Sequence, residues 1–373
     1  MATLLTDAQR ERIESFIENL KNEIGIPYID VICYREHQQL FRYYTGAGVN
    51  GKEQLYMYSC TKPVTVSAAM RLIEEGRLSL DDNVGKYLPE INSAYVVDEN
   101  GNKRTVGDKM TVRHLITMSA GFNYDTKTAP ILALCEKSEG KANLRDFISA
   151  FVESPLDFEP GRRFGYSLCH DVLAAVIECV SGKRFSSFVN ETILSPIGMT
   201  NSRLDNGEEG VADMYMAEPD GEIKKIDEGK NLRITENYES GGAGLVSCVE
   251  DYILFADALA SGGVAKNGYR VLSEKTLARL YTEELKTLSL DSGFTCIQGD
   301  DYNYGLGVRV RKTPTEWGLP VSEFGWDGAA GSYLMVDPVR HISIVIGMHL
   351  RLWPRVFKGR HLEIVKAIYN EIL

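Results

Sequence analysis

Long apolar runs and blocks of basic residues are both missing from this sequence of 373 residues. No apolar run approaches the roughly 18–20 residues that a membrane-spanning helix needs. The net charge is −11, from 41 Lys and Arg against 52 Asp and Glu. Such a chain offers little electrostatic attraction to a phosphate backbone or an anionic lipid surface. We therefore expect neither nucleic acid nor membrane among its partners, and its oligomeric state stays open.

Cysteine and histidine are sparse. The seven cysteines and six histidines are scattered, without a CxxC pair or a spacing typical of a zinc site. We expect reduced thiols, no metal and no other cofactor. The first residues also lack the basic-then-apolar pattern of an export signal, so a cytoplasmic location is expected, although a trimmed signal would leave no trace.

Several catalytic motifs are missing as well. The sequence has no Walker GxxxxGK[ST] loop, no HExxH and no GxSxG. P-loop nucleotide enzymes, zincins and α/β-hydrolases are thereby disfavoured. What remains, with 44% hydrophobic and 25% charged residues, is the composition of an ordinary globular protein.

Hydrophobic patterns place secondary structure at both ends of the chain. Residues 6–23 have apolar side chains at helical spacing, and 27–36 with 40–48 predict a β-hairpin. A helix is predicted over 60–76, several strands within 304–349, and a last amphipathic helix at the C-terminus.

Short helices and loops alternate between residues 77 and 234. The order of elements predicts an α+β fold, with an antiparallel sheet that takes strands from both chain ends and is flanked by helices. Residues 1–76 and 235–373 would form this α/β lobe of a single catalytic unit, and 77–234 an inserted, mainly helical lobe.

One Ser-x-x-Lys motif begins an apolar helical pattern: Ser59-Cys60-Thr61-Lys62, followed by Pro63. Proline fits the first turn of a helix, which places Ser59 at its N-terminus. Residues three apart share a helix face, so the Lys62 amine can reach the Ser59 hydroxyl. The helix dipole there favours negative charge near that hydroxyl and disfavours an ammonium. This arrangement predicts a nucleophile and its base.

The motif by itself is a weak signal. Ser138-Glu139-Gly140-Lys141 has the same spacing within a polar, glycine-containing stretch, and we interpret it as a chance match. For Ser59, the alternative is an N-cap serine beside a solvated lysine.

Two further segments carry candidate site residues. The first is Tyr166-Ser167-Leu168, just after a turn-forming Glu-Pro-Gly, and the second runs from Trp326 to Gly331, before a predicted strand. Small residues there would let a substrate backbone approach the strand edge. The alternatives are a tyrosine that only packs and a tight turn.

Together and in this order, the three segments resemble the serine β-lactamase and penicillin-binding-protein-like superfamily. Supporting segments are MTVRHLITMSAGF (110–122), ILSPIGMTNSRL (193–204) and GGAGLVSCVEDYILFA (241–256). The likeness covers roughly residues 10–373, and its specificity comes from the ordered set. It implies an antiparallel sheet beside a helical lobe, with the site in the cleft between them.

The resemblance also implies roles for individual residues. Ser59 would be the acylated nucleophile, Lys62 its base partner and Tyr166 a proton shuttle. The backbone N–H groups of Ser59 and Ala329 would form the oxyanion hole. The candidates for substrate binding are Leu168, Trp326, Asp327, Gly328 and Arg351.

Two positions depart from the lactamases and peptidases of this superfamily. Those enzymes usually have Tyr-x-Asn where this sequence has Leu168, and a Lys or His where it has Trp326. The asparagine usually binds an amide of the substrate and the cation helps to hold a carboxylate. Arg351 or Arg355 could replace the cation, with a solvated surface as the alternative. Tyr-Ser-Leu with Trp-x-Gly is more similar to the family VIII carboxylesterases.

Three neighbours of the motifs invite other interpretations. His170 and Asp171 are adjacent on a predicted helix and point to different faces, so we do not expect a His-Asp pair. Cys60 is interpreted as a buried apolar side chain and not as a redox group.

The resemblance implies a cofactor-independent serine hydrolase that forms an acyl-enzyme on Ser59, with a small-molecule ester or amide as substrate. An esterase for small acyl esters is preferred, and a β-lactamase or a D-alanyl-D-alanine carboxypeptidase is the alternative. A second alternative is a non-catalytic binding or scaffolding protein of the same fold. The complete set of Ser59, Lys62 and Tyr166 argues against it, and Trp326 argues weakly for it.

Overall fold

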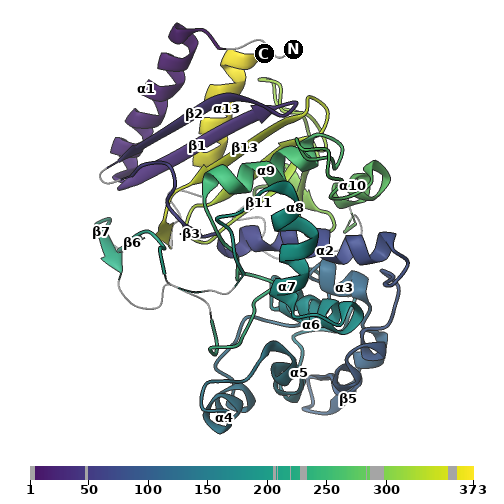
Figure 1. Cartoon of the computed structure of the whole chain (residues 1–373). Helices are drawn as coiled ribbons and strands as arrows, with labels where there is room; N and C mark the ends of the chain where they lie inside the picture. The colour runs from purple at the N-terminus through teal and green to yellow at the C-terminus, as the bar shows by residue number, and fades with distance from the viewer. Residues whose placement is uncertain are drawn as a thin grey trace.

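Helices make up much of the chain (Figure 1). The computed structural model describes residues 5–46, 49–204, 207, 209–218, 220–226, 233–282, 284–285, 298–351 and 359–373. The α-helices are α1 (Asp7–Ile24), α2 (Thr61–Glu74), α3 (Val112–Ile116), α4 (Ala129–Lys137), α5 (Leu144–Glu153), α6 (Cys169–Ser181), α7 (Phe185–Val189), α8 (Ser195–Ile197), α9 (Val249–Ala260), α10 (Glu274–Leu280) and α13 (Arg360–Ile372).

The largest sheet takes strands from both ends of the chain. Its order is β2-β1-β13-β12-β11-β10-β9, and its described neighbours pair antiparallel. This confirms the predicted α+β fold. The strands are β1 (Tyr28–Arg35), β2 (Gln38–Gly46), β9 (Tyr302–Tyr304), β10 (Arg309–Arg311), β11 (Phe324–Asp327), β12 (Tyr333–Asp337) and β13 (Ile342–Gly347).

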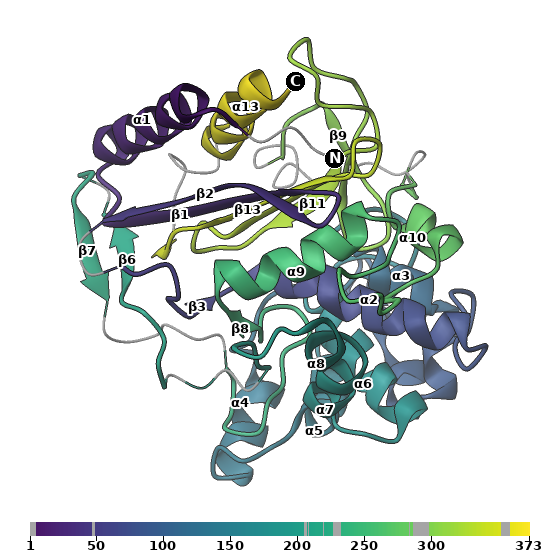
Figure 2. The same ribbon diagram turned by 45° about the horizontal axis from the view of Figure 1, so that its top comes forward.

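Helices cover both faces of this sheet (Figure 2). On one face α1 and α13 lie side by side, and Ile17 and Ile368 join Ile29 and Ile344 in one apolar cluster. On the other face α9 packs against β1, β12 and β13. A strand covered on both sides needs apolar residues at every position. This is why β13 is a continuous run of buried residues.

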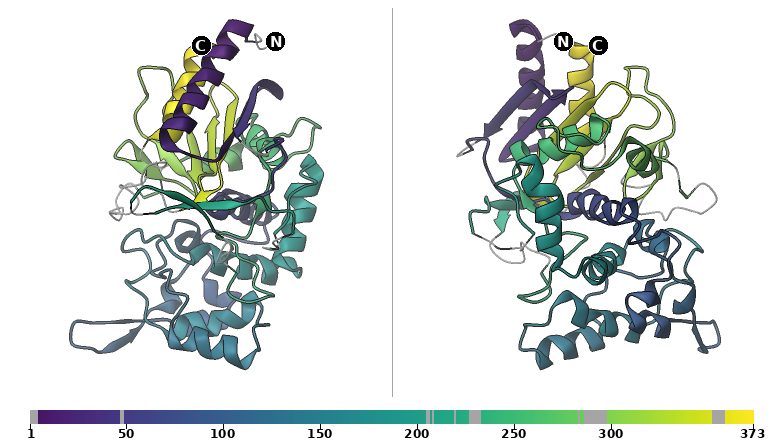
Figure 3. Two further views of the ribbon diagram at one scale, coloured as in Figure 1. Left: turned by 90° about the vertical axis from the view of Figure 1, so that its left-hand side faces the viewer. Right: turned by 45° about the vertical axis from the view of Figure 1, so that its right-hand side comes forward.

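The helices from α3 to α7 lie on the side of the molecule away from the termini (Figure 3). At their centre α6 contacts α2, α3, α5 and α7. Because α2 also contacts β11, this one helix joins the sheet to the helical region. Ser59 directly precedes α2, so the candidate nucleophile lies at the junction.

Among the described residues, three smaller sheets lie outside the seven-stranded sheet. A hairpin of β4 (Tyr95–Val97) and β5 (Lys103–Thr105) projects from the helical region, and β3 (Leu55–Tyr56) pairs with β8 (Val246–Ser247). The hairpin of β6 (Met214–Ala217) and β7 (Ile223–Ile226) pairs with β14 (Leu350–Arg351). The stretch 77–234 therefore makes a strand contact with the C-terminal part, and the proposed lobe boundaries stay a prediction.

Several local predictions are confirmed. The first helix, the hairpin, α2 and α13 occur where the patterns placed them. The hairpin turns at Glu36 and His37, which have φ of 49° and 67°, as a two-residue turn with the twist of the strands requires. One difference concerns Trp326, which lies inside strand β11, while the tight turn comes after it at Gly328–Gly331.

Within the part of the chain that the structure describes, no helix is both long and apolar enough to cross a membrane.

Candidate active site

Ser59 lies in a tight turn at the start of α2. The turn is a 3-10 helix, Tyr58–Cys60, that continues directly into the α-helix. Tyr58 has a φ of 44°, in the left-handed region that is costly for an aromatic residue. Burial holds Tyr58 and Cys60 in place, while Ser59 between them is partly exposed. The strained turn thus presents the Ser59 hydroxyl at the surface of a rigid element.

Lys62 is completely buried one turn further on. Its Nζ lies 3.2 Å from Ser59 Oγ, 2.9 Å from Tyr124 Oη and 2.8 Å from the carbonyl oxygen of Gly242. The Ser-Lys contact expected from the spacing is therefore present. A neutral amine in this place would be able to accept the Ser59 proton.

Tyr124 is a residue that the sequence reasoning missed. It follows the segment 110–122 in a loop, its ring centroid lies 5.5 Å from that of Tyr166, and 38% of its surface is exposed. Lys62 Nζ donates to the Tyr124 hydroxyl, and the centroid of the Tyr166 ring lies 4.7 Å from the same nitrogen. The only signal was its place directly after a segment that resembles the superfamily.

Trp326 covers Tyr166. The indole Nε1 donates a hydrogen bond of 3.1 Å to Tyr166 Oη, and the two rings are 5.7 Å apart. Trp326 itself is buried against Tyr304. The second and third motifs therefore meet beside Lys62.

The turn after β11 is joined to the turn of Ser59. Ser332 Oγ donates to the Met57 carbonyl at 2.9 Å, and the Cys60 thiol lies 3.5 Å from the Trp326 carbonyl. A β-carbon on Gly328 would lie 2.3 Å from the Met57 oxygen, so only glycine allows this approach. Ala329 follows at the exposed rim.

Asp327 and Arg351 contact different partners. The Asp327 carboxylate faces Arg309 at 3.6 Å and His361 at 3.7 Å, and it also accepts from Gln298. Burial opposes ionisation, yet Arg309 and His361 hold the pKa of Asp327 below its usual value. Arg351 lies over the Tyr58 ring, 6.0 Å from its centroid. Thus the structure does not bring the Asp327 carboxylate together with Ser59, and Arg355 lies outside the described residues.

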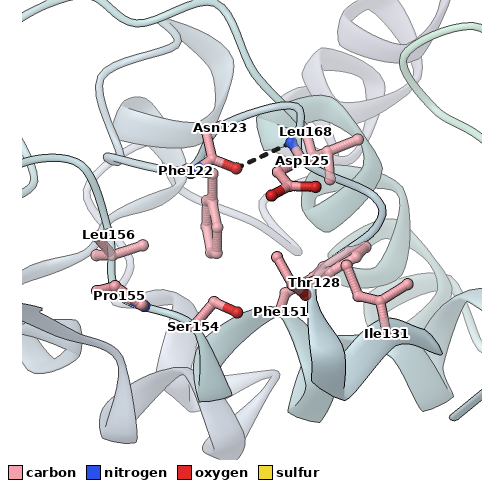
Figure 4. A pocket seen from close by; sticks show the side chains of 10 residues that line it. All are labelled: Phe122, Asn123, Asp125, Thr128, Ile131, Phe151, Ser154, Pro155, Leu156 and Leu168. Atoms are coloured by element: carbon pink, nitrogen blue, oxygen red, sulfur yellow. Dashed lines mark hydrogen bonds between the residues drawn. The ribbon is translucent and has the colours of Figure 1, made fainter. Parts of the chain in front are cut away.

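Leu168 begins α6 and joins it to the Tyr124 loop. Its backbone N–H donates to the Asn123 carbonyl at 3.2 Å, and its side chain lines a small pocket with Phe122 and Ile131 (Figure 4). Leu168 also lines a groove of about 480 Å³ with Tyr124. The side chain in place of the usual asparagine is therefore an apolar wall beside the Lys62 centre.

His170 is the imidazole that lies near Lys62 among the described residues. Burial lowers the pKa of His170 to about 3, with the Lys62 charge adding to the effect, and its Nε2 lies 3.1 Å from the Ile116 carbonyl. Across the described ranges, no group of three or more His, Cys, Asp or Glu side chains could hold a metal ion. The chemistry available is that of a hydroxyl, an amine and two phenols.

Comparison with known proteins agrees with this arrangement. The Beta-lactamase family model matches residues 13–367. Esterase EstB of Burkholderia gladioli is 27% identical over 341 residues, covering 84% of this chain and 82% of EstB.

Two solved structures share the fold. EstCE1, described as a hydrolase with promiscuous acyltransferase activity, gives a TM-score of 0.77 at 23% identity over 97% of this chain and 98% of its own. A simvastatin synthase (LovD) mutant from Aspergillus terreus gives 0.80 at 18% identity over 98% and 95%. The family-model match, which spans residues 13–367, shows that this protein belongs to the Beta-lactamase family.

Proposed function

We propose that this protein is a serine hydrolase that cleaves small acyl esters through an acyl-enzyme on Ser59. The observation that carries the proposal is the 3.2 Å contact between Lys62 Nζ and a partly exposed Ser59 Oγ in a strained turn. A hydroxyl becomes a nucleophile when a positioned base takes its proton. The relationship to EstB and the shared family support a hydrolase.

Each step of the reaction has a group to perform it. Ser59 Oγ attacks the ester carbonyl carbon while its proton passes to Lys62. The carbonyl oxygen becomes negative and accepts hydrogen bonds from the N–H groups of Ser59 and Ala329. The carbon–oxygen bond to the alcohol then breaks, and the alcohol leaves with the proton held at Lys62. Water attacks the acyl-enzyme in the same way, which releases the acid and restores Ser59.

Both tyrosines are expected to contribute to this proton transfer. Tyr124→Phe removes a hydroxyl 2.9 Å from Lys62 Nζ, and Tyr166→Phe removes one bonded to Trp326. We expect both variants to lower kcat, by up to about 10²-fold for a lost group in proton transfer. Steady-state kinetics with p-nitrophenyl butyrate measures this, and an unchanged kcat in either variant removes that tyrosine from the mechanism.

An ester is preferred to a β-lactam because of the side chains around the centre. Leu168 and Trp326 are both buried there, and neither side chain offers the partner that the amide or the carboxylate of a β-lactam would need on losing water. Each loss costs on the order of 1–3 kcal/mol. A short acyl ester carries neither group.

We expect kcat/KM to be at least about 10²-fold higher for p-nitrophenyl butyrate than for nitrocefin, because 1.4 kcal/mol corresponds to about one decade. A D-Ala-D-Ala peptide completes the panel, and Leu168→Asn with Trp326→Lys should narrow the difference. Efficient nitrocefin turnover by the unchanged protein would overturn the esterase preference and favour Arg351 as the carboxylate binder.

A further inference from the structure

A buried carboxylate is linked to Lys62 through the loop 240–244. Asp171, in the first turn of α6, is 1% exposed. We propose that Asp171 is a positioning residue that acts through Ser240 and Gly242 to hold Lys62 beside Ser59 and to stabilise the charged form that Lys62 takes while it holds the Ser59 proton. The proposal rests on the proposed function of Ser59 and Lys62.

Hydrogen bonds lead from Asp171 to Lys62 without interruption. Ser240 Oγ donates to Asp171 Oδ1 at 2.6 Å and accepts the N–H groups of Gly242 at 3.2 Å and Ala243 at 2.9 Å. The Gly242 carbonyl then accepts from Lys62 Nζ at 2.8 Å. The acceptor that holds Lys62 is thus fixed by a serine whose own hydroxyl is oriented by Asp171.

Glycine lets the two charges approach. A β-carbon on Gly242 would lie 2.8 Å from Asp171 Oδ2 and 3.4 Å from Lys62 Nζ. A β-carbon on Gly241 would lie 2.2 Å from the His170 carbonyl. The Gly242 backbone therefore lies close to both the carboxylate and the amine, and a side chain at either position would push the loop away from α6.

Asp171 is not explained by a local structural role alone. Burial raises its pKa, while the Ser240 hydroxyl and the Lys62 charge oppose that rise. The Tyr238 hydroxyl and the Gly242 backbone also interact with the carboxylate. A buried carboxylate is costly unless hydrogen bonds and a positive charge compensate it. A nearby positive charge offsets that cost, and Lys62 is the group placed to supply it.

Two thiols and an imidazole near Lys62 are neutral near pH 7. Burial raises the pKa of Cys60 to about 12 and that of Cys169 to about 11, and lowers the pKa of His170 to about 3. The phenols of Tyr124 and Tyr166 also face the amine. Among these described neighbours, Asp171 is the carboxylate.

Two variants separate charge from geometry. Asp171→Asn keeps an oxygen that can accept from Ser240 but removes the charge. Without the carboxylate the ammonium form of Lys62 is less favoured, so the acid limb of kcat/KM for p-nitrophenyl butyrate should move to lower pH by about 1–2 units. Ser240→Ala keeps the Asp171 charge but removes the hydrogen bonds that hold the loop 240–244. We therefore expect kcat to fall about tenfold, with a smaller change in KM. The acid limb of the pH profile should stay at the same pH.

Asp251→Asn is a matched control. Asp251 is also buried in the first turn of a helix and also accepts a serine hydroxyl, from Ser202 at 2.9 Å, but it belongs to a different network. Asp251→Asn should leave the acid limb of the kcat/KM pH profile at the same pH. An unmoved limb in Asp171→Asn, or an equal shift in Asp251→Asn, would overturn the proposal.

A second readout does not depend on turnover. In protein with ¹³Cε-labelled lysine, the Lys62 signal, identified by its loss in Lys62→Met, should titrate with a lower midpoint in Asp171→Asn than in the unchanged protein. An unchanged midpoint refutes the link even if the enzyme is active. A lowered midpoint in a protein without esterase activity supports the link and refutes the proposed function instead.

Discussion

Replacing Ser59 by alanine is expected to lower kcat/KM for p-nitrophenyl butyrate by about 10⁴–10⁶-fold, the loss typical of a missing nucleophile. Among the serine hydroxyls of the described centre, that of Ser59 combines partial exposure with a 3.2 Å contact to the Lys62 amine. The phenol of Tyr124 also contacts that amine, but an aryl ester formed there would be a poorer intermediate, so it should not substitute. Steady-state hydrolysis and the folded state of the variant, by circular dichroism, are the measurements.

The same prediction can be tested by labelling. A fluorophosphonate probe should modify one residue, and mass spectrometry should place it on the peptide that contains Ser59. Ser138 offers a matched control, because its Ser-x-x-Lys spacing occurs at the end of α4, where its hydroxyl donates to the Cys135 carbonyl at 3.3 Å. Ser138→Ala should keep full activity. Labelling at Ser138, or activity that survives in Ser59→Ala, would show that the nucleophile is elsewhere.

Replacing Lys62 by methionine is expected to lower kcat by about 10²–10⁴-fold, with a smaller change in KM. Methionine keeps the length of the buried side chain but can neither take the Ser59 proton nor donate to Gly242 and Tyr124. The rate of fluorophosphonate labelling should fall with kcat, because both depend on the removal of the Ser59 proton.

Lys141→Met is the control for this variant, since Lys141 is the lysine of the chance motif. It should be as active as the unchanged protein. Because a buried lysine also contributes to folding, the melting temperature of both variants has to be measured. A folded Lys62→Met protein with full kcat would remove Lys62 from the mechanism and leave the nucleophile without its base.

The parts of the site that could be predicted were those set by local geometry. The Ser-x-x-Lys spacing brought Ser59 and Lys62 together because residues three apart on a helix are neighbours in any fold. The meeting of Tyr166 and Trp326 could be expected only through resemblance, because 160 residues separate them. Tyr124, which is 62 residues from Lys62, carried no pattern of its own and was missed.

For Asp171 too, the sequence predicted the local arrangement but not the distant contact. Neighbouring residues on a helix point to different faces, and His170 does contact a different partner from Asp171, the Ile116 carbonyl. The sequence could not reveal the contact of Asp171 with Ser240, because 69 residues separate the two and the contact depends on how the loop 240–244 crosses α6. Asp327 belonged to a candidate motif by sequence, yet the alternation of side chains along β11 directs it to Arg309 and His361.

By itself, the sequence determined the helices and hairpin whose apolar period or turn residues are local, and the order of motifs that marks the family. Only the tertiary structure decided which strands become neighbours, that Tyr124 bonds to Lys62, and that Asp171 is linked to Lys62 through the loop 240–244. The physical reason is that the spacing of apolar residues determines which face of one helix or strand is buried. A site, in contrast, is assembled from side chains of several elements. How these elements lie relative to one another follows from the packing of the whole core. Gly242 is an example, because the absence of its β-carbon lets the loop fit between the Asp171 carboxylate and the Lys62 amine.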